Sequence, residues 1–352
     1  MKLILANPRG FCAGVYMAID VVDQLLDILD DEPIYVYHDI VHNLHVVNRF
    51  KERGVTFVED VEDVPHNSII VFSAHGVSPA VRTAAAKRKL DMIDATCPLV
   101  TKVHAEAIRY ARRGWQILLV GHHDHQEIIG TRGEAPDSIQ VVDSVESIKT
   151  LQIDDPTKLI YLTQTTLSMD DASTIINALK VAFPEINSPP SEDICYATTN
   201  RQHAVRVLAP QCDVVLVVGS RNSSNSLRLT EIAEAAGTRA HLIDDVDELS
   251  EEMLSGSTSV LVTAGASAPE DLVQSLILKL IQDHGGEIEQ HDIFHESVEF
   301  GLPGTLKKFM RTRDIDPEGR RITMDDMAST NRFLDQHGIP YNVVDLTVSA
   351  AD

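Results

Sequence analysis

Short, continuous apolar runs recur along the chain, and most are followed by a polar loop and a segment of different periodicity. The runs are rich in Val, Ile and Leu and extend over Leu3–Ala6, Ile69–Phe72, Ile117–Val120, Leu159–Leu162, Val214–Val218 and Val260–Thr263. After the first run, apolar residues recur at a helical spacing, at Val15, Ile19, Val22, Leu26 and Leu29. Strands that are apolar throughout and alternate with helices are typical of parallel sheets covered on both faces. The pattern therefore predicts an α/β fold.

The loops that follow these runs are the expected place for chemistry. Each contains Ser, Thr, Asn, His or Gly, and ligands of parallel sheets gather at the carboxyl ends of the strands. Six similar units indicate an internally repeated architecture rather than one large sheet. No GxGxxG follows the first strand and no GxxxxGK[ST] occurs, so neither a dinucleotide site nor a P-loop is predicted.

Length, charge and cysteine content limit the class of protein that this chain can be. A chain of 352 residues is too long for one ordinary core, so two or three domains are expected. The net charge of −23 argues against nucleic acid as a partner. No apolar stretch is long enough for a signal peptide or a membrane span, so we expect a cytoplasmic protein without membrane contact. Four cysteines in a reducing compartment are buried thiols, metal ligands or nucleophiles.

Three of the cysteines stand at predicted strand–helix loops. They are Cys12 in GFCAG, Cys97 in DATCPLVTK and Cys195 in EDICYATTNRQ, whereas Cys212 precedes a strand and is expected at the opposite edge as a structural thiol. Buried cysteines are common, so each alone could be structural. The absence of close pairs disfavours a zinc knuckle. Three distant thiolates suit an iron–sulfur cluster whose remaining iron has no protein thiolate and can act as a Lewis acid.

Polar loops offer the parts of an anion pocket. His42, His75 and His125 precede or follow predicted elements, and Ser223, Ser224 and Asn225 lie in RNSSNS. Hydroxyls, amides, imidazoles and backbone N–H groups bind phosphate without many lysines. Glu127 is the best-placed carboxylate for proton transfer, although a solvated surface charge is the ordinary fate of a Glu.

Other interpretations compete for some of these residues. Ser267 in S-A-P-E, with Pro269 at the first helical position, is typical of a helix cap, and Ser168 with Asp171 is similar. The close spacing of His122, His123 and His125 is also compatible with a zinc site, and hence with a zinc hydrolase.

Taken together, the motifs resemble one family. PRGFCAGV, VHN, SAHGVSP, DATCPLVTKVH, GHxxHxE, TQTTLS, DICYATTNRQ, VVGSRNSSNS and VTAGASAPE occur in order between about Leu3 and Lys308. This series is similar to the LytB/IspH family of 4-hydroxy-3-methylbut-2-enyl diphosphate reductases, which form isopentenyl and dimethylallyl diphosphate in the last step of the methylerythritol phosphate pathway.

The resemblance implies a trefoil of three pseudo-threefold-related α/β domains with small parallel sheets around a central cluster. The expected segments are an N-terminal strand and cysteine loop (1–13), three α/β domains (14–96, 97–194 and 195–283), a family segment (284–308) and an extra tail (309–352). The implied cofactor is a [4Fe–4S] cluster, or a [3Fe–4S] form once the open iron is lost, on Cys12, Cys97 and Cys195. Residues implied to bind the diphosphate are His42, His75, His125, Ser223, Ser224, Asn225 and Ser267. Glu127 is implied to deliver protons together with Thr165, which also lies near the substrate's alcohol.

The implied reaction is a reductive dehydroxylation in which the substrate alkoxide binds the open iron. Ferredoxin or flavodoxin is the implied electron donor. Rival functions are a hydro-lyase that uses the same iron without electrons, the zinc hydrolase, and an iron–sulfur sensor, which the acidity disfavours. The tail from Phe309 onward exceeds the family pattern. We interpret it as a peripheral addition, with a partner or self-association surface as the alternative.

Overall fold

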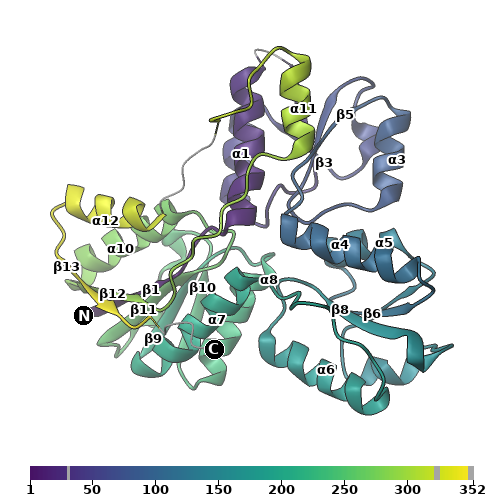
Figure 1. Cartoon of the computed structure of the whole chain (residues 1–352). Helices are drawn as coiled ribbons and strands as arrows, with labels where there is room; N and C mark the ends of the chain where they lie inside the picture. Colours follow the sequence, from purple (N-terminus) through teal and green to yellow (C-terminus); the bar gives the residue numbers. More distant parts are fainter. Residues whose placement is uncertain (30–31, 321–325, 348–352) are drawn as a thin grey trace.

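The computed structural model describes residues 1–29, 32–320 and 326–347 of the chain. Every strand pairing in these residues is parallel, and the strands form three sheets. Figure 1 shows three lobes, each built on one sheet and flanked by helices. The predicted α/β fold of small parallel sheets is confirmed.

The first sheet joins strands from both ends of the chain. Its order is β10–β9–β11–β1–β12–β13. The strands are β1 (Lys2–Asn7), β9 (Val214–Val218), β10 (Arg239–Ile243), β11 (Ser259–Ala264), β12 (Glu287–Asp292) and β13 (Tyr341–Asp345). Leu3 of β1 lies opposite Val260 on one side and Ile288 on the other. The N-terminal strand is therefore an interior strand of this sheet.

The other two sheets are smaller. The second has the order β3–β2–β4–β5, and the third β7–β6–β8. Their strands are β2 (Ile34–Tyr37), β3 (Thr56–Val58), β4 (Ile69–Phe72), β5 (Asp91–Asp94), β6 (Gln116–Val120), β7 (Ile139–Val142) and β8 (Leu159–Thr163). The strands β4, β6, β8, β9 and β11 are fully or almost fully buried, which is why they read as continuous apolar runs.

Helices cover the sheets. They are α1 (Ala13–Ile28), α2 (Leu44–Glu52), α3 (Pro79–Lys87), α4 (Pro98–Ala111), α5 (Gln126–Glu134), α6 (Met169–Ala182), α7 (Tyr196–Leu208), α8 (Ser224–Ala235), α9 (Glu251–Leu254), α10 (Glu270–His284), α11 (Gly304–Thr312) and α12 (Asp326–Gln336). Short 3-10 helices lie at Val61–Asp63, Glu146–Thr150, Pro156–Lys158, Ala209–Gln211 and Val246–Glu248. No helix of the described residues combines the length and the apolar character needed to cross a bilayer.

The C-terminal region is packed against the rest of the protein. Leu306, Phe309 and Met310 of α11 are buried with α1 against the second sheet, so the boundary expected between 308 and 309 falls inside a helix. After α11 the described chain continues with α12, a turn containing Gly338 and β13. Figure 1 shows α12 beside α10, with β13 at the sheet edge.

Candidate active site

Three cysteines stand at equivalent positions at the starts of three helices. Cys12, Cys97 and Cys195 are the N-cap residues of α1, α4 and α7, and all three line one cavity. The cavity has a volume of about 90 Å³. An added Cβ on Gly14 would lie 2.5 Å from Cys97 Sγ and 3.9 Å from Cys12 Sγ. Glycine at this position therefore lets two of the loops approach each other closely.

The three thiols fit an iron–sulfur group better than a single metal ion. Within the described residues, no group of three or more His, Cys, Asp or Glu side chains could hold a metal ion. Burial raises the pKa of all three thiols, that of Cys195 to about 11. A metal cluster removes this penalty because it binds the thiolate directly, and helix N-termini favour the negative charge. Three thiolates from three loops are a donor set that a cluster uses.

Glu127 and Thr165 form a buried hydrogen-bonded pair in the same cavity. The Thr165 backbone N–H donates to Glu127 Oε1 at 2.6 Å, and its hydroxyl donates to Oε2 at 3.0 Å. Glu127 is only 2 % exposed. Burial raises its pKa to about 7, although both Thr165 bonds act in the opposite direction. This carboxyl is therefore near half protonation at neutral pH, where it can both give and take a proton.

Three histidines from two lobes meet on another wall of the cavity. The rings of His42 and His75 are stacked with centroids 3.9 Å apart, and His125 lies edge-on to His42 at 5.2 Å. Burial lowers the pKa of His42 to about 4 and that of His125 to about 3, and it also lowers the pKa of His75. His125 Nδ1 accepts from the Glu127 backbone N–H at 3.2 Å, so the neutral ring carries its proton on Nε2. An anion is the ligand that suits these three histidines, because it accepts hydrogen bonds from the ring N–H groups and favours the protonated form of the rings.

Residues of the lobe built on the first sheet complete the polar wall. Ser223 is the N-cap of α8, and Ser224 and Asn225 form its first turn. Asn225 Oδ1 accepts from the Ala266 backbone N–H at 2.9 Å. Its Nδ2, like His42 Nε2, is buried without a hydrogen-bond partner among the described residues. Such nitrogen atoms facing a cavity beside a helix N-terminus are suited to phosphate oxygens.

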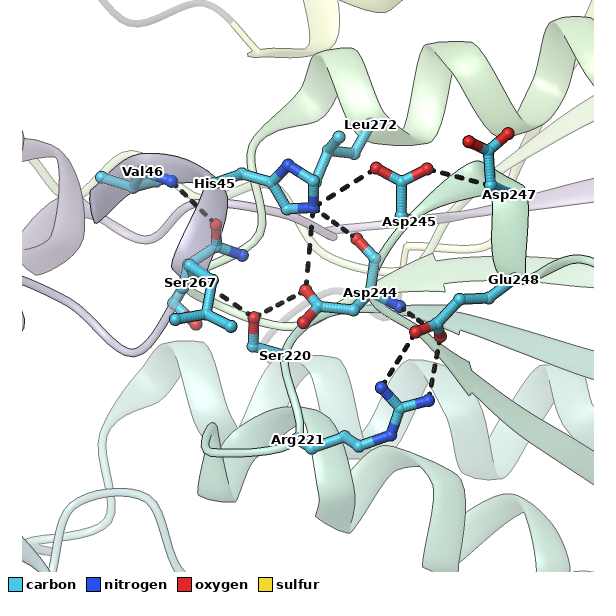
Figure 2. A network of polar contacts seen from close by, with 12 residues as sticks. His45, Val46, Ser220, Arg221, Asp244, Asp245, Asp247, Glu248, Ser267 and Leu272 are labelled. Atoms are coloured by element: carbon cyan, nitrogen blue, oxygen red, sulfur yellow. Dashed lines mark hydrogen bonds and ion pairs between the residues drawn. The ribbon is translucent and has the colours of Figure 1, made fainter. Parts of the chain in front are cut away.

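A polar network fastens the loop that contains His42 to the lobe built on the first sheet (Figure 2). At the N-terminus of α2, His45 Nε2 donates to the Asp244 carbonyl oxygen at 2.9 Å. Ser220 Oγ donates to Asp244 Oδ1 at 2.6 Å and accepts from the Leu44 backbone N–H at 3.4 Å. The His42 carbonyl oxygen in turn accepts from Ser267 Oγ at 2.9 Å. The wall is thus shared between two lobes and depends on their docking.

All twelve residues proposed for the site line this one cavity: Cys12, His42, His75, Cys97, His125, Glu127, Thr165, Cys195, Ser223, Ser224, Asn225 and Ser267. The capping interpretation of Ser267 is wrong. Helix α10 begins at Glu270 and its N-cap is Pro269, so the Ser267 hydroxyl is used elsewhere, on His42 and on Ser223. The cap predicted for Ser168 is confirmed, because its side chain accepts from the Asp171 backbone N–H.

The zinc site considered for the close histidines is contradicted. His122 contacts Arg228 at 3.2 Å, and His123 lies near Asp143 at 3.8 Å. His125 alone of the three lines the cavity. The side chains diverge because the loop turns sharply before α5. Cys212 lies outside the cavity, before β9, and packs at the edge of an apolar cluster.

Sequence reasoning missed the groups that hold the cysteine loops. Arg201 is 1 % exposed and donates from Nε to the Gly10 carbonyl oxygen at 3.1 Å and from Nη1 to Glu296 at 3.0 Å. The Tyr196 hydroxyl accepts from the Ala13 backbone N–H at 3.3 Å. The sequence signal that could have revealed them is their position in DICYATTNRQ, where Tyr196 and Arg201 follow the candidate ligand Cys195.

Comparison with known proteins agrees with this geometry. Residues 3–281 match the sequence model of the LytB protein family. A 4-hydroxy-3-methylbut-2-enyl diphosphate reductase of Rhodopirellula baltica is 52 % identical over 309 residues, 88 % of this chain and 97 % of that protein. The structure of the E-1-hydroxy-2-methyl-but-2-enyl-4-diphosphate reductase from Plasmodium falciparum has a TM-score of 0.86 at 40 % identity, covering 89 % of this chain and 99 % of that one. A further solved (E)-4-hydroxy-3-methyl-but-2-enyl diphosphate reductase, described as the terminal enzyme of the non-mevalonate pathway, has a TM-score of 0.58 at 30 % identity, covering 80 % and 100 %.

Three parallel sheets around a cavity with three thiols and a carboxyl–hydroxyl pair define the class as an α/β iron–sulfur enzyme. The chain belongs to the LytB family. An iron–sulfur cofactor comes with that assignment.

Proposed function

We propose that this protein reduces (E)-4-hydroxy-3-methylbut-2-enyl diphosphate to isopentenyl and dimethylallyl diphosphate, as the last step of the methylerythritol phosphate route to isoprenoids. The carbon–oxygen bond of the allylic alcohol breaks, two electrons and two protons enter, and the oxygen leaves as water. The observation that carries the proposal is the convergence in one cavity of three helix-capping thiols, a buried Glu–Thr pair and an imidazole–hydroxyl–amide wall.

A [4Fe–4S] cluster held by Cys12, Cys97 and Cys195 would supply the electrons and a Lewis-acidic iron without a protein thiolate. A [3Fe–4S] form would arise where that iron is lost. The electron donor we propose is a ferredoxin or a flavodoxin, and the compartment is the cytoplasm, where the unpaired cysteines stay reduced.

The diphosphate is assigned to the polar wall. Neutral imidazoles of His42, His75 and His125 donate N–H groups, and the α8 N-terminus adds backbone N–H groups with Ser223, Ser224 and Asn225. Ser267 adds a hydroxyl from the facing loop. The substrate's carbon chain then extends toward the thiols, because both walls belong to the same cavity.

Glu127 is assigned as the proton donor. Its pKa of about 7 leaves much of it protonated at neutral pH, and burial keeps that proton from exchanging freely with water. Thr165 holds both carboxyl oxygens, through its backbone N–H and its hydroxyl. It thereby fixes the direction in which the carboxyl presents its proton and offers a hydroxyl to the substrate's alcohol.

The test is anaerobic purification with iron and sulfide determination, followed by addition of the substrate and a reduced dye. The expected result is bound iron and sulfide with dye-dependent formation of both products. Turnover without any reductant would establish the hydro-lyase instead, and zinc without iron or sulfide would overturn the cluster. Glu127→Gln should still bind the substrate while product formation falls, because the amide cannot donate the required proton at the same rate.

A further inference from the structure

The segment formed by α12 and β13 lies beyond residues 3–281, which match the family model, yet it reaches the buried part of the lobe built on the first sheet. Leu334 of α12 is fully buried in the apolar cluster that also contains strands β1 and β11. Strand β13 pairs along its length with β12, Ile288 lying opposite Tyr341. The segment is therefore part of the packed protein, and the interpretation of it as peripheral leaves its buried polar contact unexplained.

That contact is made to a buried ion pair. Arg9 donates from Nη2 to Glu270 Oε1 at 2.7 Å and from Nε to the same oxygen at 3.1 Å, with side-chain exposures of 3 % and 5 %. Arg9 also donates to the Ala6 carbonyl oxygen at 2.9 Å. Arg9 lies in the loop between the end of β1 and Cys12, and Glu270 is the first residue of α10. The ion pair therefore connects this loop to the start of α10.

Thr330 of α12 supplies a further hydrogen bond to the same carboxylate. Its side chain is fully buried, and its hydroxyl donates to Glu270 Oε1. The other oxygen, Glu270 Oε2, has no hydrogen-bond partner among the described residues. A buried ion pair is stabilising only when its remaining hydrogen-bonding capacity is well satisfied. The hydroxyl from α12 is therefore the one contact from the C-terminal segment that holds this carboxylate in place among the described residues.

Two loops that meet at the ion pair belong to the proposed active site: the one between β1 and Cys12 and the one between β11 and α10. The Cys12 backbone N–H donates to the Ala266 carbonyl oxygen at 3.1 Å, and the Gly10 N–H donates to the Ala264 carbonyl oxygen at 3.2 Å. Ser267 lies in the same short loop, directly before α10. A displacement of Glu270 would thus move a cluster loop and a diphosphate loop together.

We propose that Thr330 is a positioning residue, through which the C-terminal segment holds the Arg9–Glu270 pair and, with it, the loop that presents Cys12. The mechanical part of this inference rests on contacts of the chain itself. Its consequence for the cofactor rests on the proposed function.

The experiment compares three variants of the full-length, anaerobically purified protein. Thr330→Val removes the hydroxyl at nearly constant shape, and Thr330→Ser keeps it. Thr347→Val is the matched control, because it removes another threonine hydroxyl of the C-terminal region that donates to a carboxylate, that of Asp345, on the surface. Hydrogen–deuterium exchange is followed at the backbone amides of residues 8–14 other than Pro8, which has none, and loss of visible absorbance in air reports cluster retention.

Thr330→Val should exchange about tenfold faster than wild type at residues 8–14, since a buried hydrogen bond to a charged group is worth that much in local opening. It should also lose its cluster faster in air, whereas Thr330→Ser and Thr347→Val should match wild type. Faster exchange confined to α12 and β13, with residues 8–14 unchanged, would overturn the proposal. A wild-type protein without iron would overturn the proposed function instead, and the exchange comparison would still decide the role of Thr330.

Discussion

Replacing Glu127 by Gln measures how the ionisation of one buried carboxyl changes the free energy of unfolding. Burial raises its pKa from the ordinary 4.5 to about 7, which corresponds to about 3 kcal/mol at about 1.4 kcal/mol per pKa unit. Because the pKa is higher in the folded protein, the carboxyl's favourable contribution is complete below pH 4.5 and is lost as the pH rises through 7. Glutamine reproduces the protonated side chain, with one donor and one acceptor for Thr165, and does not ionise.

The assay is urea unfolding of the cluster-free, reduced protein at several pH values, since loss of a cluster would make unfolding irreversible. The free energy of unfolding of Glu127→Gln minus that of wild type should grow by up to about 3 kcal/mol between pH 4.5 and pH 8. Other titrating groups cancel in this difference. The exposed Glu234→Gln is the control and should show no such trend. A constant difference for Glu127→Gln would refute the pKa reasoning and, with it, the carboxyl's assignment as proton donor.

Three further outcomes are expected. Cys97→Ser should lose most bound iron and Cys212→Ser should retain it, as measured by iron and sulfide content, because only the former lines the cavity. Gly14→Ala should also lower the iron content, since its Cβ would lie 2.5 Å from Cys97 Sγ, whereas Gly304→Ala, with nothing within 4 Å, should be neutral; equal iron in both would contradict the packing argument. Binding of inorganic diphosphate near pH 6.5 should be accompanied by proton uptake at His42, because the bound anion raises the pKa of this residue from about 4. Calorimetric binding heats that are the same in buffers of different ionisation enthalpy would refute this.

Much of the fold could be predicted from the sequence, because buried parallel strands leave an unambiguous signal. The run Leu3–Ala6 became β1 (Lys2–Asn7), and Val214–Val218 became β9 with the same bounds. Strand β2, Ile34–Tyr37, has alternating burial and contains two tyrosines, so it did not stand out as a run of Val, Ile and Leu. The order of strands was also inaccessible, since nothing local in KLILA indicates that β1 lies between β11 and β12.

The site was predicted by residue type, and its supporting contacts were not. Glu127 could be named from its position near His125, whereas Thr165, 38 positions away, was named only through the family resemblance and not from any local pattern. For Ser267 the local pattern indicated a helix cap beside the diphosphate role that the resemblance implied, and its hydroxyl instead donates to the His42 carbonyl oxygen of another lobe. Contacts of this kind depend on how the lobes dock, which short-range sequence patterns do not record.

The position of β1 has a consequence for how the protein is made on the ribosome. The apolar residues Leu3 and Leu5 are synthesised early, but the β12 strand that completes their pairing ends at Asp292. At about 5–20 residues per second, β1 waits on the order of 15–60 s for its neighbours. Contacts between such distant residues form slowly. The first of the proposed cysteine ligands to emerge is thus among the last to be fixed in space, and we expect cluster insertion to follow synthesis of nearly the whole chain.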